Sequence, residues 1–240
     1  MKINYAIVAS DNNPMYLDFW PIVRDLWINL IKIKPILVLI SDKDKVTDND
    51  DHIIHEIKKV DNISTAFQSQ ICRMYVTKYY PDFVCITSDI DMLPLSYRYF
   101  NEIANSYNDD NIVILSSDAY HNIDRYPLCY NVAKGSTFND ILNLDCSFLE
   151  YCERLSSRDQ GWDTDELYFG ECIRLFNKER IVFLDRIWLY GIASKRIDRA
   201  YYCGYDINML KSGDYIDCHS LRPYSQYKHE IDKLISNIWN

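Results

Sequence analysis

Short apolar runs alternate with amphipathic stretches through the first hundred residues. Four runs are apolar enough to form buried strands: residues 5–9, 35–40, 52–57 and 83–87. Between them, apolar side chains recur at helical spacing over residues 17–30 and 64–80, and Pro81 ends the second of these helices. Near-continuous apolar strands that alternate with helices predict an α/β fold with a mixed, mostly parallel sheet flanked by helices.

The second half of the chain is less regular. We expect strands at residues 112–115 and 180–184 and helices at residues 140–155 and 164–176. The tail from residue 201 onward is rich in aromatic and polar side chains and poor in periodicity. Because no repeat or linker interrupts the chain, we expect one domain over residues 1–240.

The composition is 48% hydrophobic and 25% charged, which is ordinary for a folded globular protein. The net charge of −9 makes non-specific binding to nucleic acid unfavourable, since the chain repels a phosphate backbone. An acidic protein can still bind a phosphorylated ligand when a metal cation lies between them.

Eight cysteines are scattered along the chain without a C-x-x-C pair, so no local pattern supports a structural zinc site. The longest apolar stretch, residues 36–40, is far too short for a transmembrane segment. The first residues do not resemble a signal peptide, and a cytoplasmic location is expected.

Asp89 and Asp91 directly follow the predicted strand at residues 83–87. Ligands of open α/β sheets bind beyond the carboxyl ends of the strands, and two carboxylates there suit Mg²⁺ or Mn²⁺. A cation at this position would neutralise a diphosphate leaving group. The alternative is that both residues only form a turn, where aspartate is common.

The helix that carries Arg73, followed by a strand that ends in Ser88-Asp89-Ile90-Asp91, resembles the core of the GT-A fold glycosyltransferases. The resemblance implies a Rossmann-like domain that binds a nucleotide-sugar donor, with UDP-sugars favoured, and an Asp-x-Asp motif that binds Mn²⁺ or Mg²⁺. It implies a donor-binding half at residues 1–95 and an acceptor-binding half at residues 96–240. The donor contacts that it implies are Ala9, Ser10, Asp11, Asn12, Arg73, Ser88 and Ile90.

Two later segments are similar to other parts of these enzymes. In Asp217-Cys218-His219-Ser220-Leu221-Arg222-Pro223, the resemblance makes His219 the third metal ligand and Arg222 a diphosphate contact. Imidazole suits Mn²⁺, and guanidinium binds phosphate through two parallel hydrogen bonds. A lone histidine is, however, more often structural than ligating.

The segment Gly161-Trp162-Asp163-Thr164-Asp165-Glu166 resembles an acidic acceptor-site motif, with Asp165 and Glu166 as the candidate catalytic carboxylates. Trp162 would stack on the apolar face of a sugar, and one carboxylate would bind or deprotonate the attacking hydroxyl. Asp163 and Glu166 are also spaced as a helix capping box, which is a purely structural alternative.

The sequence therefore predicts a metal-dependent hexosyltransferase that moves a sugar from a nucleotide-sugar to a hydroxyl of a glycan or another acceptor. The segment around His219 favours retention of configuration and the segment around Asp165 favours inversion, so the stereochemistry stays open. Three alternatives remain: a non-catalytic nucleotide-sugar-binding domain, a haloacid-dehalogenase-type phosphatase and a nucleotidyltransferase. A nucleotidyltransferase usually carries a glycine-rich phosphate loop near its N-terminus, whereas no glycine precedes Gly135 in this chain.

Overall fold

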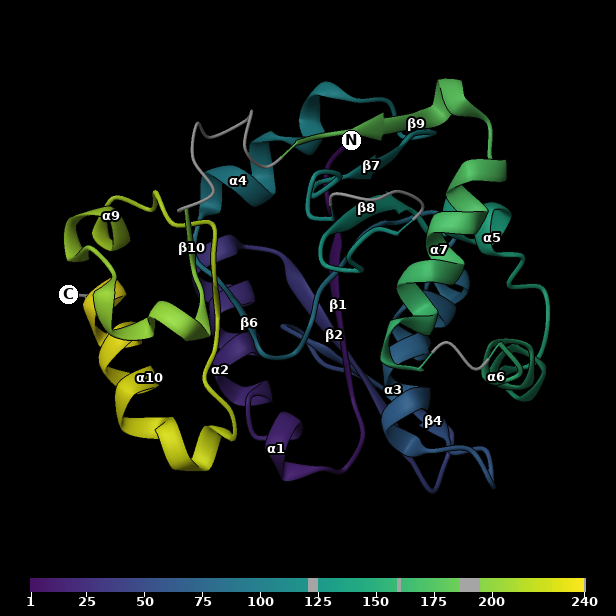
Figure 1. Cartoon of the computed structure of the whole chain (residues 1–240), viewed down its shortest axis with the longest axis horizontal. Coiled ribbons are helices and arrows are strands. Elements are labelled where there is room, and N and C mark those ends of the chain that lie inside the picture. The colour runs from purple at the N-terminus through teal and green to yellow at the C-terminus, as the bar shows by residue number, and fades with distance from the viewer. Residues whose placement is uncertain (121–124, 159–160, 186–194, 240) are drawn as a thin grey trace.

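The computed structural model describes residues 1–120, 125–158, 161–185 and 195–239. Their strands form an eight-stranded sheet in the order β3-β4-β2-β1-β5-β8-β7-β9 and a three-stranded sheet in the order β10-β11-β6 (Figure 1). The strands of the main sheet are β1 (Tyr5–Ser10), β2 (Lys34–Ser41), β3 (Lys45–Asp48), β4 (Ile53–Lys58), β5 (Val84–Thr87), β7 (Ile112–Ile114), β8 (Asn131–Lys134) and β9 (Ile181–Phe183). Those of the small sheet are β6 (Met92–Pro94), β10 (Arg196–Ile197) and β11 (Asp217–His219).

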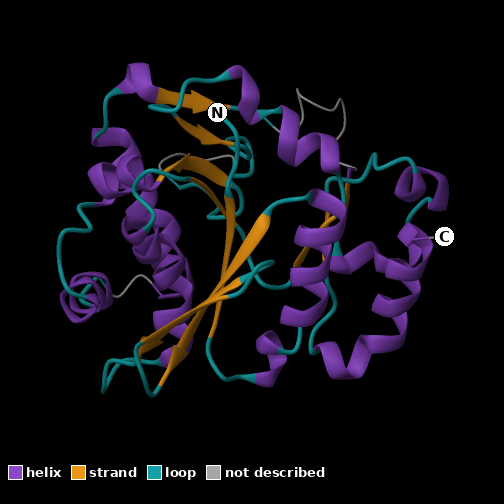
Figure 2. Cartoon of the chain, turned by 180° about the vertical axis from the view of Figure 1, so that it is seen from behind, coloured by secondary structure: helices purple, strands orange, loops and turns teal. Residues whose placement is uncertain are grey.

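Helices lie on both sides of the main sheet (Figures 1 and 2). One side carries α3 (Thr65–Tyr75), α5 (Gly135–Leu142), α6 (Phe148–Ser156) and α7 (Thr164–Leu175). The other carries α1 (Pro14–Leu17), α2 (Trp20–Asp25), the π-helical turn η1 (Leu26–Ile31), α9 (Ile207–Lys211) and α10 (Tyr224–Trp239). The remaining helical segments are α4 (Tyr97–Glu102) and the 3₁₀ turns η2 (Val76–Tyr79), η3 (Ala104–Ser106), η4 (Gly161–Asp163), η5 (Lys178–Arg180) and η7 (Arg199–Gly204). In the described ranges, no helix combines the length and the apolar content that a bilayer-crossing segment needs.

The sheet separates two hydrophobic clusters, and its central strand contributes to both. Ala6 and Val8 of β1 belong to one cluster, whereas Ile7 between them belongs to the other. Successive side chains of a strand point to opposite faces, so a continuously apolar strand is stable only when both faces are covered. The fold class expected from the sequence, a mixed and mostly parallel sheet flanked by helices, is confirmed. Parallel pairs join β2, β1 and β5, and antiparallel pairs join β5 to β8 and β8 to β7.

Several helix boundaries differ from those expected. The single helix expected over residues 17–30 is divided into α1, α2 and η1, and Pro14 and Pro21 stand in the first turns of α1 and α2. Proline lacks an N–H and favours a helix start, so the chain begins a new helix there. The helix expected over residues 140–155 is two helices, because Asn143 ends α5 in the left-handed conformation with a φ of 49°.

The tail after residue 201, which shows little periodicity in the sequence, contains α9, β11 and α10. Ile231 and Leu234 of α10 are fully buried at helical spacing. This repeat is short and lies among exposed polar residues, so it produces only a weak periodic pattern in the sequence.

We expect Gly135→Ala to destabilise the fold. A Cβ atom added to Gly135, at the junction of β8 and α5, would lie 2.3 Å from the carbonyl oxygens of both Thr77 and Tyr80. Backbone atoms cannot move aside easily, so the loss in the free energy of unfolding should be about 2 kcal/mol or more in urea titrations. Gly204→Ala is the control, since nothing lies within 4 Å of its added Cβ atom. Equal stability of the two variants would contradict this packing argument.

Candidate functional site

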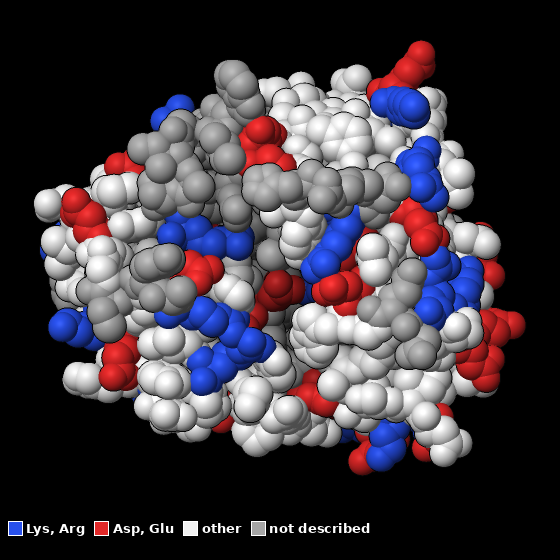
Figure 3. Space-filling model, viewed as in Figure 1, with Lys and Arg blue, Asp and Glu red and all other residues white. Residues whose placement is uncertain are grey.

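The candidate site lies where the carboxyl ends of β1 and β5 meet. The two strands are parallel neighbours, with Ile7 paired to Thr87, so the residues that follow them emerge at the same edge of the sheet. A pocket of about 590 Å³ opens there. Figure 3 shows a hollow at the centre of this face, with acidic side chains inside it and basic side chains beside it.

Most of the sequence-predicted site residues line this pocket: Ala9, Ser10, Asp11, Arg73, Asp89, Ile90, Asp91, Asp165, Glu166, His219 and Arg222. Asn12 and Ser88 do not. Asn12 is exposed beyond the end of β1, and Ser88 is fully buried with its backbone N–H donating to the carbonyl of Ile7 at 2.9 Å. Asp11 is held in place because its carboxylate accepts hydrogen bonds from the Thr65 hydroxyl and the Asn13 N–H.

The small sheet brings the C-terminal segment to the aspartates. β11 runs antiparallel to β6 with His219 paired to Met92, and the N–H of Ser220 donates to the carbonyl of Asp91 at 3.0 Å. Met92 directly follows Asp91, so this pairing brings the end of β11 to the segment that carries Asp91. The Nε2 atom of His219 lies 3.8 Å from the Oδ2 atom of Asp91.

Asp91 is buried among cationic groups. Its Oδ2 atom lies 3.0 Å from an Nη atom of Arg199 and 3.4 Å from Nε of Arg222. Burial lowers the pKa of His219, although the Asp91 charge opposes this shift. The imidazole is therefore neutral near pH 7, which is the form that binds a metal.

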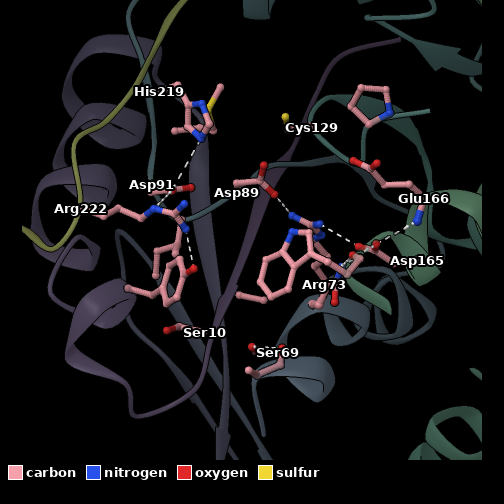
Figure 4. Close-up of a pocket in the computed structure, with 18 of the residues that line it drawn as sticks. Ser10, Ser69, Arg73, Asp89, Asp91, Cys129, Asp165, Glu166, His219 and Arg222 are labelled. Carbon is pink, nitrogen blue, oxygen red and sulfur yellow. Dashed lines mark hydrogen bonds and ion pairs between the residues drawn. The ribbon is translucent and has the colours of Figure 1, made fainter. Parts of the chain in front are cut away.

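A second ion-pair network extends from Asp89 to α7 (Figure 4). Arg73 of α3 contacts Asp89 through one nitrogen and Asp165 through the other, the latter at 3.0 Å. Gln70, one helical turn earlier, donates to the second oxygen of Asp165 at 2.8 Å. Asp165 is fully buried, and burial raises the pKa of its carboxyl to about 6 even though Arg73 acts in the opposite direction.

Arg125 and Tyr120 hold the N-terminus of α7 through its acidic side chains. Arg125 forms a bidentate pair with Asp163, at 2.7 and 2.8 Å, and also contacts Glu166 at 2.7 Å. Tyr120 donates to the Glu166 carboxylate at 2.9 Å. Asp163 precedes the helix but makes no side-chain capping bond, so the capping-box alternative is wrong. Trp162, just before it, lines the pocket and is 65% exposed.

The donor atoms present suit a divalent cation, although arginines neutralise them in this structure. Two ligands of one small divalent cation, each at about 2.1 Å, lie at most roughly 4.2 Å apart, so the 3.8 Å between Asp91 and His219 is compatible with shared binding. Asp89 is directed instead to Arg73 (Figure 4). Across the described ranges, no three histidine, cysteine or acidic side chains are clustered as a metal site.

Sequence reasoning missed several side chains that line the pocket. Gln70 could have been found, because it lies three residues before Arg73 on a predicted helix. Arg196 and Arg199 had no such signal, since they belong to a segment without periodicity. Arg196 forms a bidentate pair with the fully buried Asp217, both bonds at 2.7 Å, because β10 and β11 pair these two residues in register.

No protein-family model and no curated protein sequence matches the chain. Solved structures of other proteins, in contrast, are similar to it. The chain is similar to a structure of the galactosyltransferase LgtC in complex with donor and acceptor sugar analogues, at a TM-score of 0.53 and 11% identity over 98% of this chain and 95% of that one. It is similar to a glycosyltransferase involved in glycosylation of the major capsid of PBCV-1, at a TM-score of 0.50 and 10% identity, with 95% and 99% of the chains covered.

A third similar structure is the glycosyltransferase GlyE of Streptococcus pneumoniae TIGR4, at a TM-score of 0.50 and 9% identity. The match covers 99% of this chain and 62% of GlyE. At such low identity the shared property is the fold, which extends over nearly the whole chain. The chain has the α/β fold of glycosyltransferases, with its pocket at the carboxyl edge of the central strands.

Proposed function

We propose that this protein is a glycosyltransferase that uses a nucleotide-sugar donor, with UDP-sugars favoured, and a divalent cation. The observation that carries the proposal is the convergence of Asp89, Asp91, His219 and Arg222 on one pocket within a glycosyltransferase fold. Two carboxylates and an imidazole suit Mn²⁺ or Mg²⁺, and a guanidinium suits a diphosphate.

In this proposal the residues after β1 and β5 bind the donor. Ala9, Ser10 and Asp11 contact the nucleoside, and Asp89, Asp91 and His219 hold the cation. When bound, the cation would offset the charge that develops on the diphosphate leaving group. Arg222 binds the same diphosphate, and its contact with the Tyr16 hydroxyl orients the guanidinium.

The other side of the pocket is proposed to act on the sugars. Trp162 offers an exposed aromatic face to the acceptor, and Asp165 and Glu166 are the candidate catalytic carboxylates. A carboxyl whose pKa is near 6 can accept and return a proton close to neutral pH. In this proposal His219 and Arg222 serve the donor although they belong to residues 96–240, the half expected to bind the acceptor.

The alternatives predict different behaviour of the same pocket. A non-catalytic domain would bind a nucleotide-sugar without consuming it, and a phosphatase or nucleotidyltransferase would act on substrates that carry no sugar. The glycosyltransferase fold and the presence of Trp162 beside two carboxylates favour sugar transfer. Release of UDP from a panel of UDP-sugars, measured alongside a phosphate-release assay, separates these activities.

We expect UDP to bind in calorimetry only when Mn²⁺ is present, and Asp91→Asn to weaken this binding at least about tenfold, since a charge-assisted contact contributes roughly 1.5–3 kcal/mol. The control is Asp42→Asn, because Asp42 is exposed and paired with Lys59 away from the pocket. Binding of UDP with equal affinity in the absence of any divalent cation would refute the role given to the aspartates.

We expect the rate of sugar transfer to fall as the pH decreases through about 6, because protonation of Asp165 removes the charge that orients Arg73. Asp165→Asn should reduce the rate by about 100-fold and abolish this limb of the pH profile.

Protonation of Asp165 does not itself destabilise the fold in acid. The pKa of Asp165 is higher in the folded protein than its ordinary value of 3.8. The proton therefore stabilises the fold fully below about pH 4, and that contribution is lost as the pH rises through about 6. Activity and this contribution to stability thus change in opposite directions. A wild-type rate that does not change between pH 5 and 7 would contradict the assignment.

A further inference from the structure

Arg199 occupies the space between two of the proposed metal ligands. It begins the turn η7, and one of its Nη atoms contacts both Oδ2 of Asp91, at 3.0 Å, and Nε2 of His219. Asp198 lies 3.6 Å from the other ring nitrogen of His219, so Nε2 is the nitrogen that faces Asp91. The guanidinium therefore uses the same two atoms that a shared cation would use.

The single negative charge of Asp91 faces two positive charges. A single carboxylate oxygen faces the guanidinium groups of both Arg199 and Arg222. The Nε atom of Arg199 is buried and has no hydrogen-bond partner among the residues that the structure describes. A guanidinium whose buried nitrogen has no partner favours an additional anion. If Asp91 turned to a cation, both arginines would lose this carboxylate contact at the same edge of the pocket.

Arg196 lines the pocket as well, but it differs from Arg199 in one decisive respect. The two side-chain bonds described for it both go to Asp217, which is fully buried and belongs to the adjacent strand. A bidentate buried pair is costly to separate. Arg199 instead holds Asp91 through one bond and is 26% exposed, so it can change partners.

We propose that Arg199 is an exchangeable counter-ion of this site. In the free protein it holds Asp91 and His219 together. It releases both to a divalent cation, and together with Arg222 it then binds the diphosphate of the nucleotide. The inference rests on the proposed function and adds a residue and an order of events to it. It also explains how an acidic protein keeps the two ligands close when no cation is bound.

The experiment measures two affinities in Arg199→Ala. Binding of Mn²⁺ alone is followed by the electron paramagnetic resonance signal of the free ion, and binding of UDP at saturating Mn²⁺ is followed by calorimetry. Exchange predicts that the substitution changes the Mn²⁺ affinity and the UDP affinity in opposite directions. Mn²⁺ should bind at least about threefold more tightly without its competitor, and UDP should bind about tenfold more weakly without a phosphate contact.

Two further variants exclude simpler explanations. Arg222→Ala removes an equal charge near Asp91 but no contact with His219, so its gain in Mn²⁺ affinity should be clearly smaller. Arg98→Ala removes an exposed arginine that pairs only with Glu102 among the contacts described for it, and it should change neither affinity. Thermal unfolding of each variant shows whether the fold is retained.

The outcomes separate this inference from the proposed function. If the wild type binds Mn²⁺ and UDP and Arg199→Ala binds both equally well, or binds both more weakly, exchange is refuted while the function stands. Equal gains in Mn²⁺ affinity for Arg199→Ala and Arg222→Ala also refute it, because charge alone would then suffice. If only Arg199→Ala binds Mn²⁺ and no variant binds UDP, the competition is supported and the nucleotide function fails. If no variant binds either ligand, both are refuted.

Discussion

The candidate site depends on the short antiparallel pairing of β6 with β11. This pairing sets His219 opposite Met92, although the two segments are far apart in the sequence, and the His219 ring lies 3.8 Å from the Asp91 carboxylate. The parallel pairing of β1 with β5 positions the aspartates themselves. A shift of one residue in the register of β11 would turn the His219 side chain to the opposite face of the small sheet. The site therefore forms only in the observed register.

Arginines balance a pocket that would otherwise be strongly acidic. Arg73 contacts Asp89 and Asp165, Arg199 contacts Asp91, and Arg196 neutralises Asp217. A buried carboxylate without a partner is strongly destabilising, so these pairs are a condition of the fold as well as of binding. They also differ in how firmly they are held. The bidentate pair of Arg196 and Asp217 joins β10 to β11 and is firmly held. The single contact of Arg199 with Asp91 can be replaced by a ligand.

The similarity to solved glycosyltransferases lies in the arrangement of strands and helices, at identities near 10%. A shared fold does not by itself define a reaction, since function depends on the side chains of the site. Here those side chains converge at the position where α/β sheets bind ligands, and their chemical types suit a metal, a diphosphate and a sugar. The proposed function therefore rests on the chemistry of these side chains, and the shared fold explains why they meet at this edge of the sheet.

The sequence by itself determined the alternation of buried strands and helices, the position of Asp89 and Asp91 at a strand end, and the helix that carries Arg73. These are local properties, because periodicity and neighbouring residues decide them. It could not reveal that Arg199 lies between Asp91 and His219, that Arg125 binds Asp163 and so replaces a capping box, or that α10 packs on the core. Those contacts join segments without periodic patterns across long distances in the chain, and only the pairing of strands and the packing of helices bring them together.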